Sequence, residues 1–285
     1  MTRRFVDLHT HSNASDGSMS PAQVVQLADE ANLAAVALCD HDTLDGLAEA
    51  QRASQHYPKL TFINGIEVSA VFPRGTLHIL GLDIDSQAQS INVLARDLRG
   101  ARDQRNPRII EALQAMGVDI TMEEVLAQLP DAHTRSNPVV GRMHIAQALC
   151  LKGYARSIDD AFAKYLAKGR GAFVDKERMS PSDAIAAIRD ANGIAVLAHP
   201  CHLLCDNYSQ LERIVKNLRA VGLGGIEVYH SDHSPEQIRQ YLNLARRLEL
   251  AISGGSDFHG SGKPHVSIGR PRTPLSAVLG ILKRR

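Results

Sequence analysis

The chain has 285 residues, of which 44% are hydrophobic and 22% are charged, and its formal net charge is +1. This composition is typical of a globular protein with a sizeable core, and it argues against a broad electrostatic attraction to nucleic acid or to a membrane surface. No apolar run approaches the roughly 20 residues that a membrane helix needs, so we expect a cytoplasmic protein without a membrane partner.

Seven short apolar runs are predicted to be strands, because each is rich in β-forming residues and bounded by turn residues. Helical stretches lie between most of them and begin with a capping Ser followed by Pro, as at Ser20-Pro21, Ser180-Pro181 and Ser234-Pro235. Strands that alternate with helices predict an α/β fold with a parallel sheet, and their number suits a barrel. The predicted strands are residues 5–9, 34–40, 60–68, 77–84, 194–199, 225–230 and 250–257.

The alternation stops between about residues 88 and 178, where only helical patterns occur. Because no strand candidate separates these helices, we predict a helical insertion at 88–178 mounted on a barrel formed by 1–87 and 179–285. The alternative is a set of ordinary outer barrel helices. The predicted helices run through 94–105 and 108–117, follow the Thr121–Glu124 capping box, run through 142–153, and extend from Ser157 to Lys168.

Imidazole and carboxylate side chains follow six of the predicted strands. In a parallel barrel the carboxyl ends of the strands share one rim, which is where such folds carry their active sites. Any one of these histidines alone would more often be a structural hydrogen-bonding group, but the repeated pattern favours a metal site. His78 stands at the start of its run, which requires a reversed strand or a ligand that reaches over the rim. The candidates are His9, His11, Asp16, His41, Glu67, His78, His199, Asp257 and His259.

This set of ligands is too large for one ion and indicates two or three. Imidazole and carboxylate without thiolate suit Mn²⁺, Fe²⁺ or Zn²⁺, of which we expect Mn²⁺. Like-charged ions about 3.5 to 4 Å apart need a shared carboxylate. Glu67 and Asp257 belong to different strands and are the expected bridges.

Seven motifs in the chain resemble those of the PHP (polymerase and histidinol phosphatase) family, and they follow the family's order over nearly the whole sequence. The resemblance implies a distorted (β/α)7 TIM-like barrel, three metal ions and an active hydrolase, since every ligand position is filled. The motifs are DLHTHS at 7–12, SDG at 15–17, CDHD at 39–42, GIE at 65–67, HILG at 78–81, AHP at 198–200 and GSDFH at 255–259.

The same resemblance implies which residues share each ion. One ion would be held by His9, His11, Glu67 and Asp257, a second by Asp16, His41 and His259, and a third by Glu67, His78 and His199.

Clustered divalent ions make phosphate-ester hydrolysis the expected reaction. They lower the pKa of a bound water, which yields a hydroxide nucleophile, and they clamp the oxygens of a phosphorus centre. The expected catalytic centre consists of His9, His11, Glu67 and Asp257. His230 could protonate the leaving alkoxide or hold a phosphate oxygen, or it could be a hydrogen-bonded histidine at the rim.

Arginines recur at every third residue of the insertion from Arg96 to Arg108. This spacing spirals slowly around a helix, so only two or three of them can face one ligand, and the alternative is a solvated basic face. Arginine is the preferred residue for bidentate phosphate binding. Arg135 and Arg142 flank a turn that opens a helix, where backbone amides also favour anions. These features predict a second phosphate subsite.

The segments from Arg102 to Asn106 and from Gly141 to Ala146 resemble the subgroup of nucleoside 3′,5′-bisphosphate phosphatases and short-RNA 5′ exonucleases. The resemblance implies release of the 3′ phosphate from compounds such as adenosine 3′,5′-bisphosphate, with the 5′ phosphate held by the insertion. Cleavage of short 5′-phosphorylated RNA is the alternative, although few aromatic residues weigh against a long RNA groove. The predicted substrate-binding residues are Arg102, Arg105, Asn106, Arg135, Arg142, His144 and His230.

Three other functions are less compatible with the sequence. A histidinol phosphatase would not need the arginine-bearing insertion. A nucleotide-binding regulator would not need an intact set of metal ligands. A metal-dependent amidohydrolase typically uses a barrel lysine, and no lysine stands at a predicted strand end. The expected partner is therefore a small nucleotide or a short RNA, with no protein partner implied.

Overall fold

The computed structural model describes residues 4–129, 139–175 and 179–282. The chain divides into two compact units, one formed by residues 1–95 with 178–285 and the other by residues 96–177. Each unit has a hydrophobic core of its own. None of the described helices is long and apolar enough to span a bilayer.

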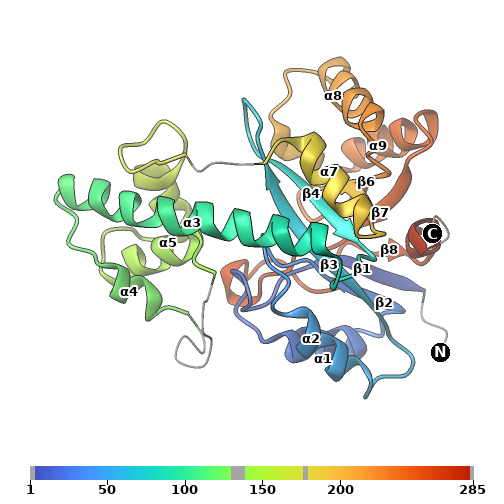
Figure 1. Ribbon diagram of the computed structural model, residues 1–285, viewed down its shortest axis with the longest axis horizontal. Helices are drawn as coiled ribbons and strands as arrows, with labels where there is room; N and C mark the ends of the chain where they lie inside the picture. Colours follow the sequence, from blue (N-terminus) through green and yellow to red (C-terminus); the bar gives the residue numbers. More distant parts are fainter. Residues whose placement is uncertain (1–3, 130–138, 176–178, 283–285) are drawn as a thin grey trace. The chain divides into compact units, whose positions relative to one another are not determined.

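The first unit is built around a mixed sheet of eight strands that curls into a nearly closed barrel (Figure 1). The end of β1 approaches the segment after β7, where His11 N donates to Phe258 O at 2.9 Å and Asp257 N donates to His9 O at 2.8 Å. The strand order is β7-β6-β5-β4-β3-β2-β1-β8. The strands are β1 (Phe5–Thr10), β2 (Ala35–Leu38), β3 (Thr61–Ala70), β4 (Leu77–Leu82), β5 (Ile194–Leu197), β6 (Gly225–Tyr229), β7 (Ala251–Gly254) and β8 (Thr273–Pro274).

All seven predicted strands are confirmed. The prediction of a parallel sheet is wrong for two strands, β4 and the additional strand β8, which run antiparallel to their neighbours. β4 runs antiparallel to both β3 and β5, because the short segment 71–76 joins it to β3 and a parallel neighbour would need a longer crossover. The additional strand β8 pairs antiparallel with β1. It consists of Thr273 and Pro274 only, which carry no apolar run that the sequence could have shown.

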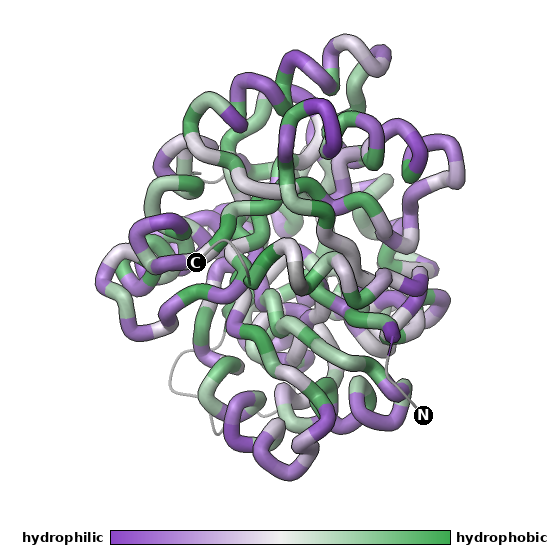
Figure 2. The backbone as a smooth tube through the Cα atoms, turned by 90° about the vertical axis from the view of Figure 1, so that its right-hand side faces the viewer, coloured by the Kyte–Doolittle hydropathy of each residue, from purple (hydrophilic) through white to green (hydrophobic). Residues whose placement is uncertain are grey.

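Helices surround this sheet, and the three predicted helix starts are confirmed. The side chains of Ser20, Ser180 and Ser234 each accept a hydrogen bond from the backbone amide three residues later. Figure 2 shows hydrophobic strand segments near the middle of the view and hydrophilic outer turns on the helices. The helices of this unit are α1 (Pro21–Glu30), α2 (Leu47–Ser54), α7 (Pro181–Asp190), α8 (Tyr208–Ala220), α9 (Pro235–Arg247) and α10 (Ser276–Leu282), with 3-10 turns η2 (Pro200–Leu203) and η3 (Gly260–Gly262).

The cap of α9 gives a first testable expectation. Ser234 Oγ accepts from Gln237 N at 3.2 Å, and Gln237 Oε1 accepts from Ser234 N at 2.8 Å. Replacing Ser234 with alanine leaves an orphan amide and should lower the free energy of unfolding by about 1 kcal/mol. Urea denaturation would measure the loss. The control Ser231→Ala, at an exposed position, should change the free energy of unfolding by less than about 0.5 kcal/mol. Equal losses in both variants would contradict the capping assignment.

The core adjoins the site along β1. Val6 and Leu8 are buried in a cluster that also contains Ala35, Ala37 and residues of α10. The register of β1 against β2 shifts between Asp7 and Thr10, and His9 lies beyond the cluster toward the carboxyl end of the strand.

The second unit is helical and contains most of α3 (Gln89–Ala115), whose first residues belong to the barrel unit. The prediction of two helices separated near Pro107 is wrong, since α3 continues through Pro107. Buried side chains on the following turns, including Ile109, Ile110 and Leu113, anchor the helix in the core of this unit and outweigh the loss of one backbone hydrogen bond. The other helices are α4 (Met122–Leu126), α5 (Arg142–Leu151), α6 (Ile158–Ala161) and a π-helical turn η1 (Phe162–Leu166).

Candidate metal centre

The strand ends of the barrel bring the predicted ligands to one place. His9 lies near the end of β1, and His41 follows β2, where its backbone forms a bridge with Glu67 of β3. His78 pairs with Ser69 near the end of β3, because β4 runs in the opposite direction. The start of β4 therefore lies at the same rim as the ends of its neighbours, which confirms a reversed strand as the explanation for His78.

Four buried side chains form a first group of potential ligands: His9, His11, Glu67 and Asp257. The Nε2 atoms of His9 and His11 lie 3.4 and 3.3 Å from Glu67 Oε2, and 3.5 and 3.2 Å from Asp257 Oδ1. Ligand atoms that share one ion at about 2.1 Å are themselves about 3 to 3.5 Å apart. The spacing of these four side chains suits a common ion.

A second group contains Asp16, His41 and His259, with His11 at its edge. His259 Nε2 lies 3.2 Å from Asp16 Oδ1, and His41 Nε2 lies 3.8 Å from Asp16 Oδ2. His11 Nδ1 is 3.9 Å from Asp16 Oδ1. His11 therefore faces the first group with one ring nitrogen and the second with the other.

Glu67 connects the first group to a third. Its Oε1 lies 2.8 Å from His78 Nδ1 and 2.9 Å from His199 Nε2, and its Oε2 lies 3.1 Å from His41 Nδ1. Ligand atoms of His41, Glu67 and His78 all lie within 4.8 Å of one another. His199, which was expected in this group in place of His41, contacts Glu67 from the side of β5. A carboxylate in contact with five imidazoles has the position expected of a bridging ligand.

Orphaned polar atoms show that these residues fit divalent cations. Within the described chain, no hydrogen-bond partner is found for buried His9 Nε2, for both ring nitrogens of His11, for His41 Nδ1 or for Glu67 Oε2. An unsatisfied buried polar atom costs about 1–3 kcal/mol, a cost that a bound cation would remove. Nitrogen and oxygen donors without thiolate suit Mn²⁺, Fe²⁺ or Zn²⁺.

The ligand histidines differ in protonation. Burial lowers the pKa of His11, but Asp257 and Glu67 outweigh burial and raise that pKa to about 9, so a cation would have to displace a proton from this ring. Burial lowers the pKa of His41 and of His199 to about 3, so both imidazoles are neutral at pH 7 and keep a lone pair for a cation. Burial raises the pKa of Glu67, but the imidazoles of His41, His78 and His9 outweigh burial and hold that pKa well below its usual value. Glu67 is therefore an ionised carboxylate.

Glu227 is a supporting residue to which the sequence analysis gave no role. Its Oε1 accepts a hydrogen bond from His9 Nδ1 at 3.0 Å, and its Oε2 accepts one from His199 N at 2.7 Å. With the proton on Nδ1, His9 presents the Nε2 lone pair to the first group. The repeated GIE sequence at 65–67 and 225–227 was the available signal, since it places a second acid at the end of a strand.

Two further acids fix the loops that carry the ligands. Asp40 accepts hydrogen bonds from Ser12 N at 2.8 Å and from Ser15 Oγ at 2.6 Å, which holds the loop between His11 and Asp16. Asp7 accepts from Ser256 N at 2.8 Å, immediately before Asp257.

His230 is buried beside the first group, with its Nε2 3.4 Å from Asp257 Oδ2. The amide of Asp232 donates to His230 Nδ1 at 3.0 Å, so the proton of the neutral ring is on Nε2, which faces the site. This arrangement supports a hydrogen-bond or proton donor rather than a metal ligand.

The sequence analysis overlooked two cations at the same rim. His202 Nε2 lies 2.9 Å from Asp232 Oδ2, and its ring centroid is 4.4 Å from that of His199. Lys263 forms an ion pair with Asp257. Both come from loops after the strands, at positions where strand periodicity gives no signal. A lysine does therefore reach this site, although not from a strand end.

The predicted substrate-binding residues of the insertion form their own buried cluster in the second unit. Arg102, Arg105, Asn106 and His144 are each at most 7% exposed. Arg105 donates to Asn106 Oδ1 from Nε at 3.1 Å and from Nη2 at 2.7 Å. Asn106 donates in turn to Val140 O at 3.0 Å, and Gly141 N donates to His144 Nδ1 at 3.0 Å.

Arg142 is engaged within the insertion. Its guanidinium lies 5.8 Å from the ring centroid of Phe162 and 5.6 Å from that of Phe173, and it donates to Leu166 O at 3.2 Å. These contacts occupy part of the donor set that was expected to bind phosphate. Arg135 lies outside the described residues.

Comparison with known proteins agrees with this geometry. Residues 7–221 match the PHP domain family. The chain is 33% identical, over 93% of its own length and 90% of the relative's, to a 3′,5′-nucleoside bisphosphate phosphatase of Chromobacterium violaceum. It is 34% identical, over 96% and 92% of the two chains, to the 5′-3′ exoribonuclease Rnm of Escherichia coli.

A solved structure shows the same fold. The protein from Bifidobacterium adolescentis, which was assigned as a metal-dependent phosphoesterase, superimposes with a TM-score of 0.87 at 34% identity, covering 98% of this chain and 96% of its own. Together with the ligand groups at the barrel rim, these similarities show that the chain belongs to the PHP family and is a metal-dependent phosphoesterase.

Proposed function

We propose that the protein releases the 3′ phosphate from nucleoside 3′,5′-bisphosphates, for example converting adenosine 3′,5′-bisphosphate to AMP. The proposal is supported by the set of metal ligands at the barrel rim and, within the second unit, by buried Arg102 and Arg105. The relative from Chromobacterium violaceum, which bears this activity in its name, supports it over nearly the full chain.

In this proposal the 3′ phosphate binds at the ligand groups. Three divalent ions, with Mn²⁺ as the preferred metal, would be held by the three groups described above, two of which share Glu67. When bound, the ions supply Lewis acidity and a water of lowered pKa. His9, His11, Glu67 and Asp257 fix the position of the reacting phosphate through the first group. His230 donates from Nε2 to a phosphate oxygen or to the leaving alkoxide.

The 5′ phosphate binds to Arg102 and Arg105 in the proposal. The amide oxygen of Asn106 accepts from both Nε and Nη2 of Arg105, which holds the guanidinium in one plane. Arg102 Nη1 lies so close to Gly141 that a Cβ at that position would be 3.4 Å away. Asn106 and His144 fix the surrounding backbone, and Arg142 and Arg135 remain proposed contributors.

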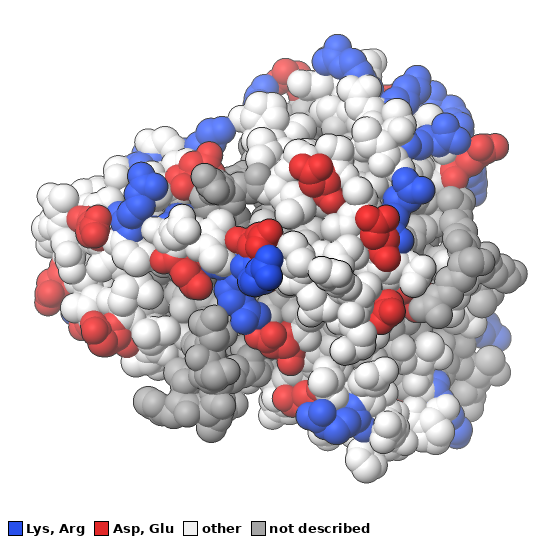
Figure 3. All heavy atoms as spheres, viewed as in Figure 1, with Lys and Arg blue, Asp and Glu red and all other residues white. Residues whose placement is uncertain are grey.

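Short 5′-phosphorylated RNA is the second candidate substrate, because the Escherichia coli relative of comparable identity is named as a 5′-3′ exoribonuclease. On the face drawn in Figure 3, the described Lys and Arg side chains are interspersed with Asp and Glu rather than gathered into a long basic track. Aromatic residues amount to only 4% of the chain. Both features favour a small nucleotide over a long strand.

A substrate panel tests the proposal. Initial rates with Mn²⁺ would be measured for adenosine 3′,5′-bisphosphate, AMP, histidinol phosphate and a short 5′-phosphorylated RNA, each with and without EDTA. The proposal predicts the highest kcat/KM for the bisphosphate and no turnover in EDTA. A higher kcat/KM for the RNA would establish the exoribonuclease instead.

The arginine pair gives a sharper prediction. Arg105→Ala should raise KM for adenosine 3′,5′-bisphosphate at least tenfold, because a bidentate phosphate contact is lost, and should leave hydrolysis of a simple aryl phosphate within about twofold. Arg105→Lys should recover only part of the loss, since lysine keeps the charge but not the fork.

The matched control is Arg96→Ala, which removes an arginine from the same helix whose side chain is 73% exposed. It should leave KM unchanged for both substrates. An equal effect of Arg105→Ala on the bisphosphate and on the aryl phosphate would refute a role in 5′-phosphate binding.

A further inference from the structure

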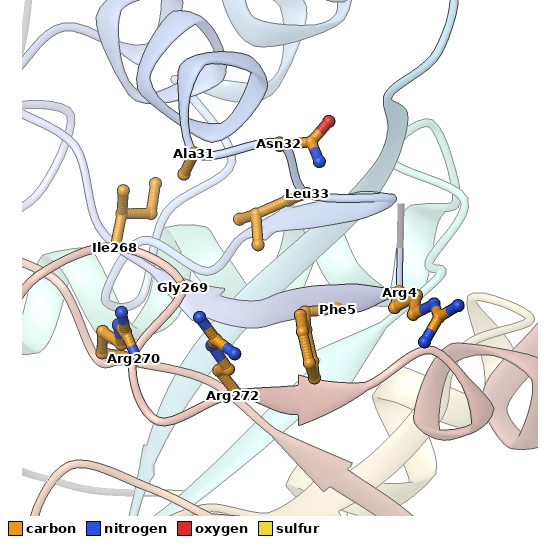
Figure 4. A pocket seen from close by; sticks show the side chains of 9 residues that line it. All are labelled: Arg4, Phe5, Ala31, Asn32, Leu33, Ile268, Gly269, Arg270 and Arg272. Atoms are coloured by element: carbon orange, nitrogen blue, oxygen red, sulfur yellow. The ribbon is translucent and has the colours of Figure 1, made fainter. Parts of the chain in front are cut away.

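A cavity of about 380 Å³ lies at the start of β1 (Figure 4). It is lined by Arg4 and Phe5, by the turn 31–33 that follows α1, and by the segment 268–272 that leads into β8. This volume is within the range of small-molecule sites. His9 lies four residues further along β1, or about 13 Å at the rise of an extended strand, so the cavity is separate from the candidate metal centre.

Three exposed arginines line this cavity and give it a positive charge. In the part of the chain that the structure describes, Arg4, Arg270 and Arg272 form no ion pair with a carboxylate, although all three line one cavity. Glu30, at the end of α1, accepts from Gln26 Nε2 instead, at 2.9 Å. The carboxyl end of α1 contributes only a partial negative charge. Neighbouring guanidinium groups that lack a carboxylate partner favour a bound anion, and among anions they favour phosphate.

Apolar side chains complete the lining of the cavity. Phe5, Leu33 and Ile268 line it, and the Arg272 guanidinium lies 5.1 Å from the centroid of the Phe5 ring. Figure 4 shows Arg270 and Arg272 near Phe5, with Leu33 and Ile268 on the opposite side. A ligand that satisfies both parts of the lining combines an anionic group with a flat apolar one. A nucleotide has this combination, since its base stacks on aromatic and guanidinium planes and its phosphate binds arginine.

The segment that carries two of the arginines is held in place. Gly269 N donates to buried Asp7 Oδ2 at 2.7 Å, and Arg270 N donates to Ser267 O at 3.1 Å. Gly269 has a φ of +73°, and a Cβ there would approach Leu33 Cδ2 to 3.0 Å. A side chain at this position would be strained and would crowd the apolar part of the lining. The cavity is therefore formed before any ligand arrives, which lowers the entropic cost of binding.

We propose that this cavity is a second nucleotide-binding site, which takes a nucleoside monophosphate with its phosphate on Arg270 and Arg272 and its base against Phe5 and Leu33. The proposal does not depend on the reaction at the candidate metal centre.

Calorimetric titration with AMP in EDTA tests the site on the full chain. Arg270→Ala/Arg272→Ala should weaken AMP binding at least tenfold. The control Arg213→Ala/Arg239→Ala removes the same charge from exposed positions on α8 and α9. It should change the affinity for AMP less than twofold. Because the proposed 5′-phosphate subsite at Arg102 and Arg105 would also take AMP, these titrations are made in an Arg102→Ala/Arg105→Ala background, in which binding to the cavity should persist. Adenosine and inorganic phosphate should each bind at least tenfold more weakly than AMP.

Photolabelling with 8-azido-AMP locates the binding independently of affinity. The label should appear on a peptide that contains Phe5 or Leu33 and should disappear in Arg270→Ala/Arg272→Ala. Unchanged AMP binding in that variant, or a label confined to other peptides, would overturn the proposal. Phosphate alone binding as tightly as AMP would also overturn it, because the cavity would then be only an anion site.

Discussion

Glu67→Ala should abolish metal binding and turnover together, with kcat/KM for any phosphate ester falling at least a thousandfold, or about 4 kcal/mol of transition-state stabilisation. The Glu67 carboxylate lies within 3.4 Å of imidazole nitrogens from His9, His11, His41, His78 and His199. Glu67 belongs to the first and third groups, so its removal takes a ligand from both. It also lies against His11 and His41, whose other ring nitrogens face the second group, so the substitution should disturb that group as well.

The control for Glu67→Ala is Glu236→Ala, which removes an exposed carboxylate from the first turn of α9. Metal content would be measured by elemental analysis and turnover by phosphate release. Circular dichroism would verify that the barrel is folded. Full turnover of Glu67→Ala after equilibration with Mn²⁺ would contradict the role of this carboxylate.

Glu227→Gln should lower metal affinity or activity by about 10- to 100-fold, although Glu227 is not expected to bind a metal directly. The carboxylate accepts two N–H groups, His9 Nδ1–H and His199 N–H. A glutamine offers only one oxygen, so one donor must face the amide NH₂ group. The His9 ring would then lose the partner that directs its Nε2 lone pair into the site.

This effect differs in kind from that of Glu67→Ala. Raising the Mn²⁺ concentration should restore most of the turnover of Glu227→Gln but none of that of Glu67→Ala. Glu236→Gln provides a matched control and should behave as the native chain. If excess Mn²⁺ does not restore Glu227→Gln, the residue acts on the chemical step rather than through His9.

The sequence was sufficient to predict the barrel strands because each is a short apolar run between turn residues. It was also sufficient to predict that the ligands lie close together, because the strand ends converge on one rim in any barrel of this kind. The orientation of β4 was not accessible from composition or periodicity, which are the same for either direction. Only the exceptional position of His78 hinted that this strand is reversed.

The supporting residues were harder to predict than the ligands. Glu227 and Glu67 have the same local sequence, GIE, yet one accepts from two N–H groups and the other lies among imidazoles. The difference arises from what the neighbouring strands place opposite each acid. Lys263 could not be found for a related reason, since a loop carries it to Asp257 and loop paths leave no periodic pattern.

The insertion shows the limits of spacing arguments. Arginines at every third residue of α3 indicated that only a few could share a face, and Arg102 and Arg105 are buried while Arg96 is exposed. The sequence could not show that Arg142 packs against Phe162 and Phe173, because those contacts join residues far apart in the chain. The helix does not end near Pro107 as predicted, because tertiary packing of α3 outweighs the low helix propensity of proline.

Anomalous diffraction at the manganese edge, from crystals of the native chain grown with Mn²⁺, measures the position of each bound ion directly. We expect three separate peaks: one among His9, His11 and Asp257, a second among Asp16, His41 and His259, and a third beside Glu67 and His78. Absence of any peak near Glu67, or peaks only at other surfaces of the protein, would contradict the metal centre from which the proposed chemistry follows.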